Sequence, residues 1–328
     1  MNRVFIIAGA GLVILALISL MLGDLPYSPA QLLDGLLQHG DPARRLILWQ
    51  IRLPRTLLAI MVGAGLGASG AALQGYLRNP LADPGIVGIS ASAGLGAVMA
   101  LYFGLTALSF WVLPGAAMAG AGLAAAILMI LARGRASITS VILGGVALSS
   151  LSVALTALLM NLSPNPWALS EIAYWLMGSV ADRSFAELAF ATPLILGGIA
   201  VLMLSAPALN ALGLGEEAAH SMGVSLNRTG QLVVFGTLLC VGAGVAVAGA
   251  IGFIGLVAPH LVRPFFGARP GALILPSALI GGVLLLAADI LARALSGPGT
   301  PLYLGVTTAL LGAPFFLYLV IKNRRAFP

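Results

Sequence analysis

Apolar residues run through this chain in long stretches that contain no charged residue. A helix needs about 20 predominantly apolar residues to cross the hydrocarbon core of a bilayer, which is about 30 Å thick. Most of the stretches reach that length, and the stretch 84–132 is long enough for two helices with a break near Pro114 and Gly115. The pattern therefore predicts about ten membrane-spanning helices. They cover residues 4–22, 56–77, 86–105, 111–132, 138–160, 188–206, 230–251, 253–267, 271–294 and 303–321.

Composition supports an all-α integral membrane protein and excludes several other classes. Apolar residues make up 60% of the chain and charged residues 8%, whereas soluble proteins carry about 25% charged residues. The basic residues are scattered and form no nucleic-acid-binding stripe. Cys240 is the single cysteine, so the chain has no internal disulfide or cysteine cluster. Lys322, the only lysine, is followed by Asn323, so a phosphate-binding Gly-x-x-x-x-Gly-Lys-Ser/Thr loop is absent.

The first apolar stretch and the basic residues set the expected topology. The run 4–22 could serve as a signal peptide, but it lacks a small-x-small cleavage site, which favours a retained span. Basic residues concentrate in cytoplasmic loops, and this rule favours both termini inside. The expected cytoplasmic set is Arg3, Arg78, Arg133, Arg135, Arg228, Arg269, Lys322, Arg324 and Arg325. The expected external set is Arg44, Arg45, Arg52, Arg55, Arg183 and Arg293.

Small residues indicate close helix packing. Gly63, Gly67, Ala71 and Gly75 are spaced four apart and lie on one helix face, where they let a neighbouring backbone approach. A weak echo relates the segment 63–80 to the segment 242–259. It indicates either an inverted repeat of the kind that transporters contain or a coincidence in a Gly/Ala-rich chain, and both interpretations stay open.

Specific motifs lie in the loops and at the helix ends. They are Arg52-Leu53-Pro54-Arg55, Arg78-Asn79-Pro80-Leu81-Ala82-Asp83-Pro84, the stretch 249–263, Ala287-Ala288-Asp289-Ile290-Leu291-Ala292-Arg293 and Gly312-Ala313-Pro314-Phe315-Phe316. Together they resemble the permease subunits of bacterial type II ABC importers for iron-siderophores, haem and cobalamin. The resemblance extends from the first span to Phe316.

The resemblance implies a transport subunit, not an enzyme. It implies a homodimer with the pathway on the two-fold axis, in the bacterial cytoplasmic (inner) membrane. Two ATPase subunits would dock on the cytoplasmic side and a substrate-binding protein on the outer side. No cofactor would be bound by this chain, and ATP and magnesium would bind to the partner ATPase, which agrees with the missing phosphate-binding loop.

Arg52, Arg55 and Arg293 lie at the expected outer membrane edge. The resemblance maps them onto arginines that dock the binding protein, and the planar guanidinium suits bidentate bonds to carboxylates. The alternative is snorkelling to lipid headgroups. Asp289 lies four residues before Arg293 on one expected helix, so a structural ion pair is favoured over a proton relay.

The loop 207–229 is expected in the cytoplasm and contains a short helical pattern that starts after Gly215 and ends at Gly223. Glu216 and Glu217 fall in its first turn, where the helix dipole favours acids. The resemblance implies the coupling helix that docks on the ATPase. Its apolar contact would be Leu212, Leu214, Ala218, Ala219 and Met222. A helix lying flat on the membrane is the alternative.

The span 138–160 begins with hydroxyl and small residues. Helix capping explains hydroxyls at such a position, whereas the resemblance implies that this helix lines the pathway. The gate candidates are Thr139, Ser140, Gly144 and Ser149. Asn79 and Asp83 are expected to hold the backbone of their own loop.

The expected function is ATP-driven import of an iron complex, either a ferric siderophore or haem. Cobalamin is the alternative cargo within the family. A secondary transporter driven by an ion gradient is the alternative from another class, suggested by Asp289 and the glycine content, and an ATPase partner would exclude it. An intramembrane enzyme is set aside because His39, His220 and His260 lie in loops or at helix ends.

Overall fold

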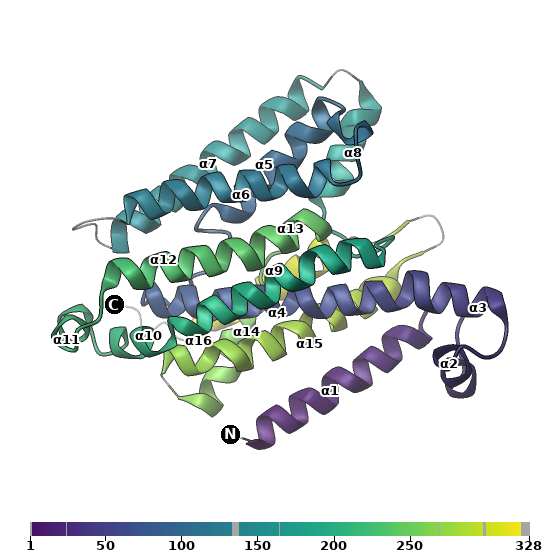
Figure 1. The fold of residues 1–328 in the computed structure, drawn as a ribbon, viewed down its shortest axis with the longest axis horizontal. Coiled ribbons are helices and arrows are strands. Elements are labelled where there is room, and N and C mark those ends of the chain that lie inside the picture. Colours follow the sequence, from purple (N-terminus) through teal and green to yellow (C-terminus); the bar gives the residue numbers. More distant parts are fainter. Residues whose placement is uncertain are drawn as a thin grey trace.

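The computed structural model describes residues 2–322 apart from 24, 133–137, 164, 268 and 298–299. Every regular element that it describes is a helix (Figure 1). The fold is that of an all-α integral membrane protein. Four of the basic residues expected in the cytoplasm, Arg133, Arg135, Arg324 and Arg325, lie outside the described residues.

Among the described residues, seven helices are long and apolar enough to cross a membrane. Three shorter apolar helices accompany them. The main helices are α1 (Asn2–Met21), α4 (Leu53–Tyr76), α5 (Ile89–Tyr102), α6 (Val112–Leu131), α7 (Ile138–Asn161), α9 (Phe185–Leu204), α12 (Leu226–Thr237), α13 (Ala243–Ala248), α14 (Ile254–Phe266), α15 (Ile274–Leu295) and α16 (Leu304–Lys322). Each of the spans expected from the sequence coincides with one of these helices or with the continuous pair α12–α13.

The second expected span is longer than its apolar run. Short helices α2 (Pro29–Leu36) and α3 (Pro42–Ile47) precede α4, and α3 continues through the π-helical turn η1 (Leu48–Arg52) into α4. The result is one helix over Pro42–Tyr76, about 52 Å long at 1.5 Å per residue. Arg52 and Arg55 interrupt the apolar run just before residue 56, although the backbone is helical from Pro42 onward. The apolar pattern therefore did not predict the first part of this helix, which projects from the bundle.

Glycines set the packing of the core around α4. A Cβ on Gly63 or Gly67 would collide with the backbone carbonyl of Gly281 or Ser277 in α15, and one on Gly75 would lie 2.6 Å from Pro270 Cβ. The expectation that these glycines share one face is confirmed. Because the backbones touch, the α4–α15 contact forms the centre of the bundle, and α9 and α14 also pack on α4.

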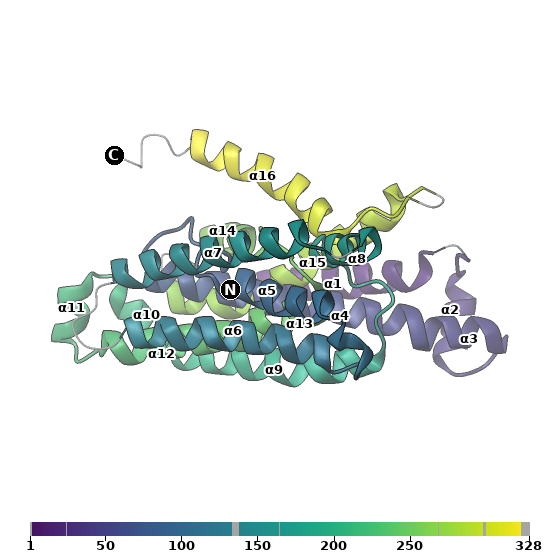
Figure 2. The ribbon, with the colours of Figure 1, turned by 90° about the horizontal axis from the view of Figure 1, so that it is seen from above.

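Helices α5, α6 and α7 form a group beside this central bundle, together with the short helix α8 (Pro166–Leu176) (Figure 1). Asn165 caps α8 by accepting a hydrogen bond from the Ala168 amide. Figure 2 shows α16 standing apart from the other helices for much of its length. Side chains of α7 and α16 are correspondingly exposed. The exposed large apolar residues are Leu143, Val146, Leu151, Val153, Leu155, Leu158, Val306, Leu310, Leu311, Leu317, Tyr318 and Ile321.

Helices α5 and α14 are too short to cross a bilayer, because 14 and 13 residues span only about 20 Å. Each follows a non-helical segment, 77–88 before α5 and 249–253 before α14. The helices that precede these segments pack antiparallel: a Cβ on Gly65 would lie 3.3 Å from Cys240 Cβ, and one on Gly244 would lie 3.3 Å from Val62 Cγ1. The two segments that echo each other in sequence thus run in opposite directions, and a common origin stays a prediction.

Candidate functional site

A buried ion-pair network lies where α4, α15 and α1 meet. Arg55 Nη2 donates to Asp289 Oδ1 at 2.8 Å, and Arg55 Nε lies 3.1 and 3.2 Å from the two carboxylate oxygens. Arg293 Nη2 lies 3.1 Å from Asp289 Oδ2 and also donates to Ser19 Oγ at 2.6 Å. The expected pair between Asp289 and Arg293 is therefore present, and Arg55 joins it from a second helix.

Exposure differs among the three side chains of this network. Asp289 is 1% exposed, Arg293 12% and Arg55 21%. One carboxylate faces two guanidinium groups, so the cluster has a net positive charge close to the protein surface. Arg55 is the member that retains the largest contact with solvent, and a docking role for Arg55 and Arg293 stays a prediction.

Arg52 has a different environment from its two counterparts. Its guanidinium donates to the carbonyl oxygens of Leu20, Met21 and Leu25 at 2.8, 3.1 and 2.6 Å. It also stacks over the Tyr27 ring, with Cζ 4.2 Å from the ring centroid. Arg52 is buried and closes the end of α1, where carbonyls lack helical partners. This arrangement favours a structural role for Arg52.

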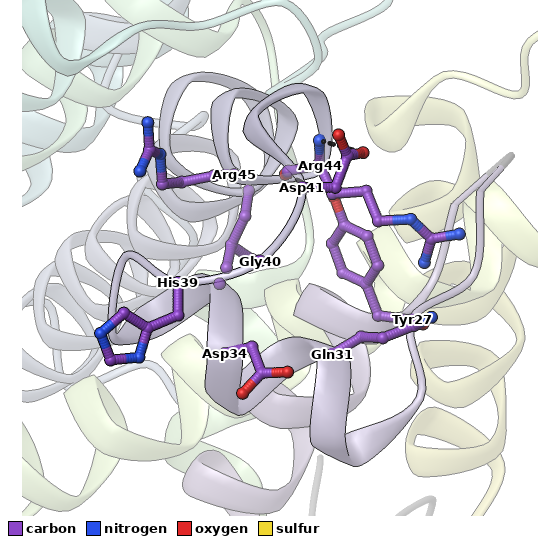
Figure 3. A pocket seen from close by; sticks show the side chains of 10 residues that line it. Tyr27, Gln31, Asp34, His39, Gly40, Asp41, Arg44 and Arg45 are labelled. Carbon is purple, nitrogen blue, oxygen red and sulfur yellow. Dashed lines mark hydrogen bonds between the residues drawn. The ribbon is translucent and has the colours of Figure 1, made fainter.

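A pocket of about 220 Å³ lies between α2 and α3 on the projecting part of the molecule (Figure 3). Asp34 and Gln31 come from α2, and Arg44 and Arg45 come from α3. Tyr27 closes one side, where its hydroxyl donates to the Arg44 carbonyl at 2.6 Å. The lining has both signs of charge. Within the described ranges, no group of three His, Cys, Asp or Glu residues is placed to hold a metal ion.

The expected coupling segment folds as two short helices at the end of the molecule opposite α2 and α3 (Figure 1). They are α10 (Ala206–Leu212) and α11 (Glu216–Ser221). Gly215 and Gly223 flank α11 with φ of 111° and 80°, values that favour glycine. The expected start and end of the short helix are confirmed, and Glu216 and Glu217 occupy its first turn.

The apolar surface of this segment is narrower than the sequence predicts. Leu212 and Ala219 are fully buried against this chain's own core, so they are not available to another protein. Leu214 and Met222 are 71% and 63% exposed, and Ala218 is half-buried. A partner on this side would therefore meet Leu214 and Met222 first. A helix of six residues is too short to show a hydrophobic period, so its sequence does not indicate which face packs against the rest of the chain.

The gate candidates on α7 fall into two groups. Thr139 is exposed and Ser140 half-buried at the start of the helix. Gly144 packs on α6, where a Cβ would lie 2.5 Å from Leu131 Cδ1. Ser149 faces the 77–88 segment and donates to the Gly85 carbonyl at 2.9 Å. Thr139 is the only exposed residue among the four, and the gate role of all four residues stays a prediction.

The 77–88 segment is ordered by its own side chains, as expected for Asn79 and Asp83. Asn79 Oδ1 accepts from the Leu81 amide at 2.9 Å, and Asp83 Oδ1 accepts from the Gly85 amide at 2.8 Å. Burial raises the pKa of Asp83, and the Gly85 hydrogen bond partly opposes that rise. One further contact, the ion pair of Arg78 Nη2 with Glu216 Oε1 at 2.7 Å, is not indicated by any pattern in the sequence.

Comparison with known proteins identifies a family and several relatives that this chain resembles over most of its length. Residues 11–322 match the model of the FecCD transport family. The chain is 39% identical over 310 residues to an Fe(3+)-citrate import system permease protein of Bacillus subtilis, covering 94% of this chain and 92% of the relative. It is 42% identical over 287 residues to a cobalamin import system permease protein of Halobacterium salinarum, covering 87% of this chain and 76% of the relative.

A solved structure agrees with these relatives. It is described as an inward-facing conformation of a putative metal-chelate type ABC transporter, and it superposes with a TM-score of 0.88 at 35% identity. The match covers 98% of this chain and all of the other. With a family match over nearly its whole length, the chain belongs to the FecCD transport family.

Proposed function

We propose that this chain is the permease subunit of an ATP-driven importer that carries an iron complex, in the first instance ferric citrate. The observation that supports it most is the similarity to the Fe(3+)-citrate permease, which extends over 94% of this chain. The described residues place no His, Cys, Asp and Glu together in a metal-binding group. That arrangement suits a cargo whose metal is already held by a chelator.

The proposal requires two kinds of partner, since this chain has no phosphate-binding loop of its own. An ATPase, with its ATP and magnesium, would bind at α11, where Leu214 and Met222 are exposed. A substrate-binding protein would bind at the opposite end, where Arg55 and Arg293 form a cationic cluster. A second copy would cover the exposed apolar faces of α7 and α16 and complete a pathway on the two-fold axis.

We infer the orientation in the bacterial cytoplasmic membrane from the position of the basic residues. Arg78, Arg228 and Arg269 belong to the end of the molecule that carries α11, and the positive-inside rule places that end in the cytoplasm. Both termini are then cytoplasmic. Uptake therefore runs from the side of α2 and α3 to the side of α11.

Cobalamin is the second candidate cargo. It is supported by the 42% identity to the Halobacterium cobalamin permease and by 40% identity over 316 residues to a vitamin B12 permease of Salmonella paratyphi A. Ferric citrate and cobalamin are both large preformed metal complexes. A wide pathway without strong metal ligands would pass either of them.

The test is uptake into proteoliposomes that contain the permease and its partner ATPase, with binding protein outside and ATP inside. Radioactive ferric citrate and labelled cobalamin are supplied in parallel. We expect uptake of ferric citrate that needs ATP and stops with vanadate. Uptake of cobalamin alone would replace the iron cargo by the second candidate. Uptake that follows an ion gradient and ignores vanadate would refute the ATP-driven mechanism.

A further inference from the structure

The 77–88 segment contacts α11 and α7, the two helices to which the proposed function assigns ATPase binding and the pathway. At its beginning, Arg78 forms an ion pair with Glu216 in the first turn of α11. Near its end, the carbonyl of Gly85 accepts the hydrogen bond of Ser149 in α7. Residues 138 positions apart are joined at one end and 64 apart at the other. The segment thus touches both the expected ATPase-binding helix and the expected pathway helix.

The end at α7 is fixed by backbone contact as well as by a hydrogen bond. A Cβ on Gly88 would lie 2.9 Å from the Gly145 carbonyl oxygen, and one on Gly145 would lie 2.8 Å from Val87 Cα. One turn into α5, the buried hydroxyls of Ser92 and Ser152 are 2.9 Å apart. Because main chains touch here, a displacement of the segment displaces α7 with it.

The segment between the two ends is stiff. Its turns are closed by the Asn79 and Asp83 side chains and by backbone bonds from Ala82 to Asn79 and from Ile86 to Asp83. Gln74 reaches from α4 to the Ala82 carbonyl at 3.4 Å and accepts from Arg263 of α14 at 2.9 Å. Pro84 packs on Gly255 at the start of α14. A segment held in this way keeps its conformation, so a displacement at one end is transmitted to the other end.

We propose that the 77–88 segment is a rigid connection that transmits movement of α11 to α7, and that Arg78 is the positioning residue through which α11 acts. The proposal rests on the proposed function, because it assigns α11 to the ATPase and α7 to the pathway. Arg78 and Glu216 are 46% and 36% exposed. An ion pair so exposed contributes little to stability, so its replacement changes the coupling and leaves the fold intact.

The variants are Arg78→Glu, Glu216→Arg and the exchange of both charges. Arg228→Glu is the matched control, an exposed arginine on the same side whose backbone amide, not its side chain, bonds Ser225. We expect each single change to lower transport per ATP hydrolysed by about tenfold. The exchange restores most of it, the control stays near wild type, and melting temperatures do not change. Wild-type transport by Arg78→Glu overturns the proposal. Two impaired single variants that the exchange does not rescue also overturn it.

A second measurement needs no transport, so that failure of the connection and failure of the proposed function are told apart. Spin labels at Thr139→Cys and Met222→Cys, in labelled chains diluted with an excess of unlabelled chains, report the distance between the start of α7 and the residue that follows α11 within one chain. Both positions are exposed, and Cys240, the only native cysteine, is replaced by alanine. A narrow distance distribution is expected in the wild type, a broader one in Arg78→Glu and in Ser149→Ala, and a narrow one again after the charge exchange. Equal distributions in all of them refute the connection whatever the protein transports.

Discussion

Arg55 and Asp289, 234 residues apart in the chain, form a bidentate ion pair between the start of α4 and the end of α15. The guanidinium presents two of its nitrogens, Nε and Nη2, to a carboxylate that is 1% exposed. Arg293 approaches the same carboxylate from the next turn of its own helix. Asp289 therefore does two things: it neutralises part of the charge and it fixes the orientation of both arginines.

The first prediction concerns this carboxylate. Asp289→Asn leaves two guanidinium groups close together without a counter-charge. Breaking a buried ion pair by removing one partner typically costs about 3–5 kcal/mol, and we expect the lower end because Arg55 and Arg293 keep some exposure. Thermal unfolding of the purified permease measures the effect. Asp34→Asn, which changes an exposed acid of α2, is the control and should unfold like the wild type. Equal melting temperatures for both variants would contradict the buried-pair interpretation.

The second prediction separates Arg52 from Arg55. Arg52 is bound to three carbonyls of its own chain, and lysine has no planar fork to replace them. Arg52→Lys should lower the melting temperature and leave the affinity for the binding protein unchanged once the protein is folded. Arg55→Lys keeps the positive charge beside Asp289 and loses only the planar fork. It should therefore weaken capture of the binding protein at high and low salt alike, and lower the melting temperature less than Arg52→Lys does. Binding isotherms at two salt concentrations, with melting curves alongside, measure both effects. Weaker capture by Arg52→Lys with an unchanged melting temperature would restore Arg52 to the docking set.

Particular residues show why some features could be predicted from the sequence and others could not. The apolar runs placed the helices because length and hydrophobicity alone decide what crosses a bilayer. Gly215 and Gly223 marked the limits of α11 because a positive φ favours glycine. The environment of Arg52 was out of reach, since its acceptors are main-chain carbonyls that any residue supplies. The pair of Arg78 with Glu216 was equally hidden, because an ion pair between distant segments has no local pattern.

The third prediction uses the contrast between neighbouring leucines of the coupling segment. Leu212 is fully buried and Leu214 is 71% exposed. Leu212→Ala should destabilise the permease by about 2–5 kcal/mol, whereas Leu214→Ala should stay within about 0.5 kcal/mol of the wild type. Co-purification with the ATPase should show the opposite order: Leu214→Ala loses the partner, and Leu212→Ala retains it as long as the chain is folded. Normal ATPase binding by Leu214→Ala and by a Leu214→Ala/Met222→Ala double variant would exclude this surface from the contact.

The last prediction tests whether close backbone approach holds the bundle together, with two adjacent glycines of α9 as an internal comparison. A Cβ on Gly198 would lie 2.9 Å from the Gly236 carbonyl oxygen and 2.6 Å from Cys240 Sγ, whereas one on Gly197 would meet nothing within 4 Å. Both sit inside the same helix, so alanine improves helix propensity equally at the two positions. Gly198→Ala should therefore lose about 1–3 kcal/mol through overpacking against α12, while Gly197→Ala should be neutral or slightly more stable. Unfolding curves in one detergent compare them directly. Equal stability would mean that the α9–α12 contact relaxes without loss, and small residues would then not be what sets the distance between these helices.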